Sequence, residues 1–288
     1  MILFMKRILI TGKHSFIGNA LIHHLTEYHT ETISLRNTSW QSEDFGRFDS
    51  IVHAAGIAHD STKNADRELY FAVNSQLAYD AALKAKHDGA NQFIFLSSSI
   101  VYGKSAPIGQ KKIITRDTPV SPESWYGESK VRAEEMLNTL NDDGFKVCIL
   151  RCPMMYGKDC KGNYPLLSKI ARSLPVFPKV HNVRSMLYVK NFAEFVRLMI
   201  ENDERGVFWP QNREYSDTSG LVKMIAEVHG RRILLLPGCE LPLKVFAHVS
   251  GMVNKAFGSL AYDMSLSDYR EDYRLYDLRW SIENTEKL

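Results

Sequence analysis

Short apolar runs alternate with amphipathic stretches along the first half of the chain. The runs are too short for helices and are typical of strands buried on both faces, whereas apolar residues three and four positions apart predict helices. We expect strands at residues 7–11, 32–35, 51–54, 93–97 and 147–150, and helices at residues 17–28, 67–86 and 126–140. This alternation predicts an α/β fold with a doubly wound parallel sheet and helical crossovers.

The pattern changes after Arg151, where prolines and glycines break the chain into loops around a short helix. A strand at 186–189 and a helix at 191–200 are expected to return to the sheet. From Gly206 onward we expect a short strand, a helix at 218–229, a strand at 233–236, further helices and a short strand at 273–276. The prediction is therefore a main body of residues 1–155 and 183–205, with a smaller mixed α/β lobe of residues 156–182 and 206–288.

Composition narrows the classes of function. The chain has 36 basic and 33 acidic residues without long like-charge runs, which gives no footprint for nucleic acid or an anionic membrane. The apolar N-terminus continues into a strand and a glycine turn, which favours a buried strand over a signal peptide. The apolar stretch 233–253 is interrupted by prolines and charged residues, so we expect no membrane span. A small-molecule partner remains the expectation.

The four cysteines lack C-x-x-C spacing, and the ten histidines are scattered. These patterns favour free thiols in a reducing cytoplasm over disulfides, and they predict no metal site.

The first expected strand ends in a turn that contains two glycines and opens a helix, Thr11-Gly-Lys-His-Ser-Phe-Ile-Gly18. Backbone amides at such a helix N-terminus, together with the helix dipole, can hold a pyrophosphate. The turn therefore indicates a Rossmann-type dinucleotide site, although a strand-to-helix turn without a ligand has the same composition.

Tyr126-Gly-Glu-Ser-Lys130 places a phenol and an ammonium one helical turn apart on one face. A phenol near a fixed cation is suited to proton exchange with a carbonyl oxygen. Because a positive charge favours the phenolate, we expect the pKa of Tyr126 to fall from about 10 toward the working pH.

Together these segments resemble the extended short-chain dehydrogenase/reductase family over nearly the whole chain. The turn is similar to the family's G-x-x-G-x-x-G, with Ser15 at the middle glycine, where it adds a hydroxyl donor or weakens the cofactor site. The segment His53-Ala-Ala-Gly56 is similar to N-A-A-G, and Asn74 matches a position that supports the active-site loop. Leu150-Arg-Cys-Pro-Met-Met-Tyr-Gly157 resembles L-R-P-x-x-V-Y-G, with Cys152 at the proline.

The segment Ser97-Ser-Ser-Ile-Val-Tyr-Gly103 resembles the family's S-S-x-x-V-Y-G. The resemblance implies a catalytic triad of Ser98, Tyr126 and Lys130, with Ser99 as the alternative hydroxyl. The cofactor-binding residues that it implies are Gly12, His14, Ser15, Phe16, Ile17, Gly18, Arg36, Ala54, Ala55, Gly56, Asn74, Ser97, Tyr126, Lys130 and Pro153.

Two later segments, Gly162-Asn-Tyr164 and Arg184-Ser-Met-Leu-Tyr-Val189, resemble the branch of the family that acts on nucleotide-diphosphate sugars. That resemblance implies that Ser99, Asn163 and Arg184 bind substrate, since a guanidinium suits a diphosphate. We expect the apolar segment 174–178 to flank a base. Within this branch the chain is most similar to reductases of UDP-4-keto-6-deoxy-N-acetylhexosamines from bacterial surface-polysaccharide pathways. The resemblance also implies a homodimer, which is common in the family.

The end of the second strand decides which nicotinamide cofactor is expected. An acidic residue there would accept hydrogen bonds from the ribose hydroxyls of NAD. The chain instead has Arg36, which can pair with a 2′-phosphate or point into water, and Lys13 and His14 add positive potential. We therefore favour NADP, with NAD as the alternative.

The expected reaction is reduction of the 4-keto group of a nucleotide-linked sugar. A 4-epimerase that holds NAD tightly would use the same triad, and a non-catalytic dinucleotide-sensing module would use the same fold. The presence of all three triad residues argues against the sensing module.

Overall fold

The computed structural model describes residues 5–57, 67–249 and 251–287 of the chain. The chain divides into two compact units. The first comprises Met1–Gly103, Val120–Cys152 and Ala193–Trp209; the second comprises Lys104–Pro119, Pro153–Phe192 and Pro210–Leu288.

A six-stranded, fully parallel sheet forms the first unit, in the order β10-β6-β4-β3-β1-β2. The strands are β1 (Arg7–Thr11), β2 (His29–Ile33), β3 (Ser50–His53), β4 (Gln92–Ser98), β6 (Lys146–Cys152) and β10 (Gly206–Phe208). The strand order reverses between β1 and β3, and the carboxyl ends of strands at such a switch point form the usual ligand crevice of an open α/β sheet.

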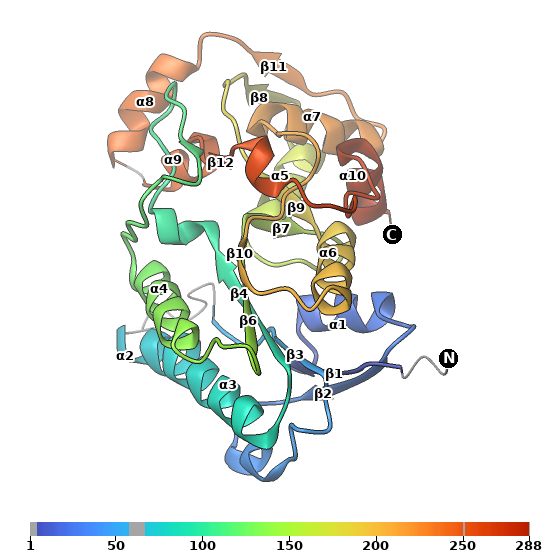
Figure 1. Ribbon diagram of the computed structural model, residues 1–288. Coiled ribbons are helices and arrows are strands. Elements are labelled where there is room, and N and C mark those ends of the chain that lie inside the picture. Colours follow the sequence, from blue (N-terminus) through green and yellow to red (C-terminus); the bar gives the residue numbers. More distant parts are fainter. Residues whose placement is uncertain (1–4, 58–66, 250, 288) are drawn as a thin grey trace. The chain divides into compact units, whose positions relative to one another are not determined.

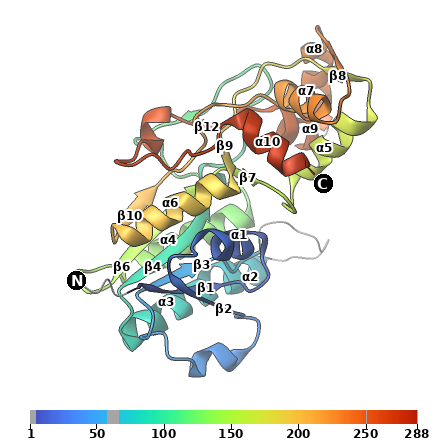
Figure 2. The same ribbon diagram turned by 90° about the vertical axis from the view of Figure 1, so that its right-hand side faces the viewer.

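Helices cover both faces of this sheet (Figures 1 and 2). One face carries α1 (Phe16–His24) and α6 (Val189–Glu201). The other carries α2 (Arg67–Tyr70), the π-helix η2 (Phe71–Gln76), α3 (Leu77–Asp88) and α4 (Trp125–Asn138). Two 3₁₀-helices, η1 (Thr38–Ser42) and η3 (Ser99–Tyr102), follow β2 and β4. These observations confirm the predicted doubly wound sheet.

The core on the α3 face pairs small helical residues with large residues from the strands. Ala78, Ala81 and Ala85 of α3 are fully buried, as are Phe93 and Phe95 of β4. Short side chains let the helix approach the sheet closely, and the two rings fill the remaining space, as close packing requires.

The second unit is mixed and contains three small parallel sheets. Their strands are β5 (Ile113–Ile114) with β12 (Ala261–Tyr262), β7 (Met154–Tyr156) with β9 (Met186–Tyr188), and β8 (Val176–Pro178) with β11 (Leu234–Leu236). The helices are α5 (Asn163–Ser173), α7 (Thr218–Val228), α8 (Glu240–Val249), α9 (Gly251–Phe257), η4 (Met264–Ser267) and α10 (Leu278–Glu286). In the described part of the chain no helix is long and apolar enough to cross a membrane.

The expected boundaries of the two bodies need three corrections. Residues 206–208 were expected in the smaller lobe, but they form β10 and extend the large sheet by pairing with β6. Residues 104–119 lie in the second unit, because β5 pairs with β12. Residues 153–155 and 183–192 also lie there rather than in the main body, since β7 and β9 pair with each other.

Candidate active site

The glycine turn after β1 packs directly against the end of β3. Gly12 has a φ of +86°, and a Cβ at this position would lie 3.0–3.1 Å from backbone atoms of Ala54 and Ala55. Both the conformation and the close approach require glycine. The turn is thereby fixed beside the switch point of the sheet.

Ser15, the departure from the family's glycine pattern, acts as the N-cap of α1. Its Oγ accepts a hydrogen bond of 2.9 Å from the amide of Gly18. Among the described residues, the amides of His14, Phe16 and Ile17 have no acceptor, and the first turn of α1 has no acidic residue. These donors at a helix N-terminus fit the pyrophosphate of a dinucleotide.

Arg36 follows the end of β2, the strand that pairs with β1 beside this turn. The amides of Gly12 and Lys13 donate to the carbonyl of Ile33 over 3.0 and 3.3 Å, which holds the end of β2 against the turn. The Arg36 side chain is exposed, and no hydrogen bond or ion pair engages its guanidinium among the described residues. It is therefore available to an anionic group near the turn.

Asn74 connects the loop after β3 to α4. Its Oδ1 accepts from the amide of Ile57 at 2.9 Å, and its Nδ2 donates to the Ile57 carbonyl at 3.0 Å and to Ser129 Oγ at 3.1 Å. Ser129 in turn donates to the carbonyl of Tyr126. The π-helix η2 carries Asn74, and such wide turns are frequent at functional sites.

The Ser98 hydroxyl lies close enough to the Tyr126 phenol to influence its ionisation. Tyr126 lies in the first turn of α4, which Ser124 caps by accepting from the amide of Gly127. Ser98 ends β4 and caps η3 through the amide of Ile100, whereas Ser99 begins η3. Desolvation raises the pKa of Tyr126 to about 12, against a lowering by the Ser98 hydrogen bond. The expected fall in this pKa is therefore wrong, because desolvation outweighs the effect of Ser98, and the neighbouring Cys152 and Tyr70 raise the pKa further.

Lys130 is buried between α4 and the sheet rather than bonded to the phenol. Its Nζ donates to the carbonyl of Leu96 at 2.7 Å and lies 4.5 Å from the centre of the Phe95 ring. Burial lowers the pKa of Lys130 to about 8, while Glu134 opposes this shift. Gly56 lies beside both Lys130 and Asn74. A Cβ at Gly56 would lie 3.8 Å from Lys130 Nζ and 3.1 Å from Asn74 Oδ1.

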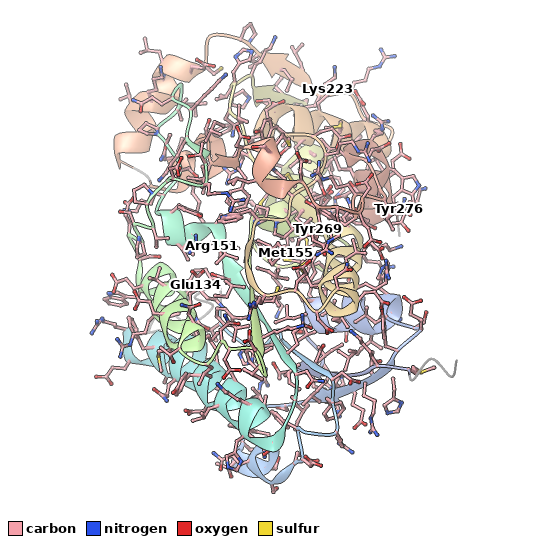
Figure 3. The ribbon with its side chains drawn as sticks, viewed as in Figure 1. Glu134, Arg151, Met155, Lys223, Tyr269 and Tyr276 are labelled. Carbon is pink, nitrogen blue, oxygen red and sulfur yellow. The ribbon has the colours of Figure 1, made fainter. Side chains whose placement is uncertain are left out.

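A polar cluster behind the triad was not anticipated from the sequence. Glu134, one turn after Lys130 on α4, accepts from Ser97 Oγ at 2.5 Å and from Arg151 Nη2 at 2.6 Å (Figure 3). Arg151 Nη1 also donates to the hydroxyl of Tyr102 at 2.6 Å, as does Trp209 Nε1 at 2.7 Å. The spacing of Glu134 from Lys130 was the available signal for this cluster.

Cys152 replaces the family's proline and pairs with Ser98 across β4 and β6. Burial raises the pKa of its thiol to about 12, so the residue stays neutral beside Lys130.

Asn163 and Arg184 lie together in the second unit. They line a cavity of about 280 Å³ whose wall is mostly apolar, with Leu166, Leu167 and Phe257 among its residues. Nη1 of Arg184 donates to the carbonyls of Lys255, Ala256 and Gly258 at 2.9–3.3 Å, at the end of α9. Among the described residues no carboxylate pairs with this guanidinium, although its burial lowers the pKa of the group.

The predicted site residues thus form two groups. The catalytic residues and all cofactor residues except Pro153 lie in the first unit, mostly at the carboxyl ends of β1, β3 and β4. Pro153, Asn163 and Arg184 lie in the second. The segment 174–178, which was expected to flank a base, contributes nothing to the cavity wall.

The chain belongs to the NAD dependent epimerase/dehydratase family, whose model matches residues 8–209. It is therefore an extended short-chain dehydrogenase/reductase, from a family of nicotinamide-dinucleotide-dependent enzymes that modify nucleotide sugars, as the sequence resemblance predicted.

Characterised relatives are similar at low identity. A UDP-glucose 4-epimerase of Vibrio cholerae is 26% identical over 90% of this chain and 88% of its own length. A UDP-2-acetamido-2,6-beta-L-arabino-hexul-4-ose reductase of Pseudomonas aeruginosa is 26% identical over 68% of this chain and 49% of its own length.

Solved structures share the fold. A dTDP-4-dehydrorhamnose reductase of Bacillus anthracis in complex with NADP superposes with a TM-score of 0.71 and 18% identity, over 90% of this chain and 91% of that one. A UDP-glucuronic acid 4-epimerase of Bacillus cereus in complex with NAD gives a TM-score of 0.71 at 16% identity, with 96% of each chain covered.

Proposed function

We propose that the protein reduces the 4-keto group of a UDP-activated deoxy sugar with NADPH, as a step in surface-polysaccharide synthesis. The observation that carries this proposal is the approach of the Ser98 hydroxyl to the Tyr126 phenol at the end of β4, with Lys130 buried one helical turn further along α4. A hydroxyl, a phenol and an ammonium at the carboxyl edge of a parallel sheet are the groups that carbonyl reduction needs.

The bound nicotinamide would supply the hydride for the carbonyl carbon. Tyr126 would give its proton to the carbonyl oxygen, and Ser98 would donate a hydrogen bond that orients the same oxygen. A phenol with a raised pKa is protonated at neutral pH, which is the form that a reduction requires at its start.

Lys130 supports this proton transfer through its charge. With a pKa of about 8 it still carries its proton at neutral pH, where it would stabilise the phenolate left by proton transfer and hold a ribose hydroxyl. Asn74 keeps the loop after β3 and the start of α4 in register, so the triad is held by buried hydrogen bonds on two sides.

The dinucleotide would lie on the free amides of His14, Phe16 and Ile17, with Arg36 beside a 2′-phosphate. Arg36 supports NADP, because its guanidinium can pair with the 2′-phosphate, whereas an acidic residue at this position would favour NAD. The substrate's diphosphate would pair with Arg184 in the second unit, Asn163 would bind near the phosphate or sugar, and the apolar wall suits a base.

The second candidate is a 4-epimerase with tightly held NAD. It is supported by the Vibrio cholerae 4-epimerase, which is similar over 90% of this chain.

Two measurements separate the candidates. The dinucleotide that copurifies is identified by mass spectrometry, and a UDP-4-ketosugar is then supplied with NADPH. A reductase consumes one NADPH for each substrate molecule. Retained NAD, together with interconversion of the 4-epimers of a UDP-hexose without net oxidation or reduction, would transfer the assignment to the epimerase. Failure to bind any dinucleotide or UDP-sugar would exclude both.

A further inference from the structure

The second unit exposes aliphatic side chains on the small sheet of β8 and β11. Val176 and Leu234 are register partners and are 41% and 63% exposed, and Leu236 is 37% exposed. Phe177, which follows Val176 on β8, is buried. Since side chains alternate along a strand, Val176, Leu234 and Leu236 share the outer face of this sheet.

Helix α8, which follows β11 in the chain, also exposes aliphatic side chains. Leu241 and Val245 lie one turn apart and are 72% and 62% exposed. The start of α8 is tied to the end of β8, because Glu240 accepts a hydrogen bond of 3.1 Å from the amide of His181. β8 and α8 occupy the same end of this unit in both views (Figures 1 and 2), and Figure 1 shows β11 there too. We call Val176, Leu234, Leu236, Leu241 and Val245 the aliphatic surface.

The segments that carry the aliphatic surface are strongly basic. Residues 172–181 and 231–245 contain five Lys or Arg and a single acidic residue, Glu240, which His181 engages. All five basic side chains are exposed, and within the described parts of the chain none of them forms an ion pair. They are Arg172, Lys179, Arg231, Arg232 and Lys244.

We propose that the aliphatic surface and its basic residues dock the protein peripherally on an anionic phospholipid membrane. Exposed aliphatic groups that can enter the headgroup boundary, surrounded by Lys and Arg, are the physical requirements of such binding. A second copy of the chain suits this surface poorly, because a two-fold contact would bring like charges together. The inference does not depend on the proposed reaction.

Docking has a consequence for the substrate site. Helix α9 packs against α8, and its residues Val253, Ala256 and Phe257 line the cavity that also contains Arg184. Membrane binding therefore places this cavity close to lipid headgroups.

Sedimentation with vesicles tests the proposal on the full chain. The parent should sediment with phosphatidylcholine vesicles that contain phosphatidylglycerol, should do so less at high salt, and should not sediment with pure phosphatidylcholine. Each basic residue near an anionic surface contributes about fivefold to partitioning, so R231E/R232E should weaken binding by at least about tenfold. L234D/L241D should weaken it similarly, since charged groups replace the inserting side chains.

Two controls match these variants: Leu83→Asp on α3, where the side chain is 44% exposed, and Lys287→Glu beyond α10. Both should bind as the parent does, and all variants should melt at the parent's temperature. Absence of binding to anionic vesicles, equal binding to neutral vesicles, or unchanged binding of both double variants would overturn the proposal. So would a fall in molar mass of L234D/L241D in light scattering, which would assign the surface to self-association. The salt dependence of the parent remains a test even where a variant folds poorly.

Discussion

Arg151 and Glu134 form a buried ion pair that joins β6 to α4, the helix that carries Tyr126 and Lys130. Nη2 and Oε2 are 2.6 Å apart, and the two side chains are 13% and 8% exposed. Glu134 also accepts from Ser97, the residue before Ser98. Glu134 therefore ties α4 to β6 through Arg151 and to β4, the strand that ends in Ser98, through Ser97.

We expect Glu134→Gln to destabilise the protein and to alter its pH profile. The amide leaves the Arg151 charge buried without a counter-ion, which typically costs about 3–5 kcal/mol. Because Glu134 raises the pKa of Lys130, its loss should move the alkaline limb of turnover to lower pH. Denaturant unfolding and a pH-rate profile measure the two effects. The exposed neighbour Glu135→Gln is the control, and equal behaviour of the two variants would refute the role of the pair.

Tyr126→Phe should abolish most turnover while leaving dinucleotide affinity nearly unchanged, because it removes the proton donor and keeps the ring. General acid catalysis is typically worth about 10²- to 10⁴-fold in rate. Steady-state kinetics and a titration with dinucleotide provide the two readings. Activity within a few-fold of the parent would exclude Tyr126 as the acid.

Arg36→Ala should weaken NADPH binding selectively, since the proposed partner of the guanidinium exists only on that cofactor. A hydrogen bond to a charged group contributes about 1.5–3 kcal/mol, so the loss should exceed about tenfold for NADPH and be small for NADH. Titration of both cofactors against parent and variant gives the answer. An unchanged preference would show that Arg36 only contacts solvent.

Arg184→Ala should lose binding of UDP by a few kcal/mol, because a diphosphate loses its cationic partner. The substitution also removes the bonds to the end of α9, so Arg184→Lys, which keeps a charge, should recover part of the affinity. Calorimetry with UDP compares both variants with Lys169→Ala, an exposed position on α5 outside the cavity wall. Equal affinity in all of them, or no binding by the parent, would contradict the nucleotide-sugar site.

His53 should make the protein sensitive to acid. Its ring is buried against Phe93 and Phe95, and burial lowers its pKa to about 3. Its Nε2 has no hydrogen-bond partner within the described parts of the chain. Below the unfolded pKa of about 6.5 the unfolded chain binds a proton that the folded chain excludes, so stability falls as the pH drops toward 3.

The loss attributable to His53 should be about 2 kcal/mol between pH 6.5 and pH 5. Unfolding at both pH values should show a smaller difference for His53→Asn than for the parent. The exposed His87→Asn should behave as the parent does; a parent-like slope in His53→Asn would contradict the prediction.

The local pattern of apolar residues was sufficient to predict the central strands of the large sheet but not its edge strand. β3, β4 and β6 each contain a short apolar run, and the predicted ranges agree to within two residues. β2 was placed at 32–35 but spans His29–Ile33, because an edge strand pairs on one side and tolerates polar residues. The helix expected at 17–28 ends at His24, and residues 273–276 form no strand.

The site could be assembled from sequence where its residues follow consecutive strands, because those ends must meet at one edge of the sheet. The pKa of Tyr126 and the position of Lys130 could not be predicted from the sequence, since desolvation depends on packing from several elements. The basic and aliphatic positions near α8 were also missed, because residues 172–181 and 231–245 come together only in the folded unit.

The π-helix Phe71–Gln76 makes the site sensitive to chain length as well as to residue identity. A wide turn takes up one residue more than regular α-helical winding would. Deleting a single residue there would let α2 and α3 join as one continuous helix, with the alanines of α3 still on the core. Each residue of an α-helix turns the chain by about 100°, so Asn74 would swing away from Ile57 and Ser129. An alignment that permits a gap in this helix would therefore preserve the packing while removing the support of the loop beside Lys130.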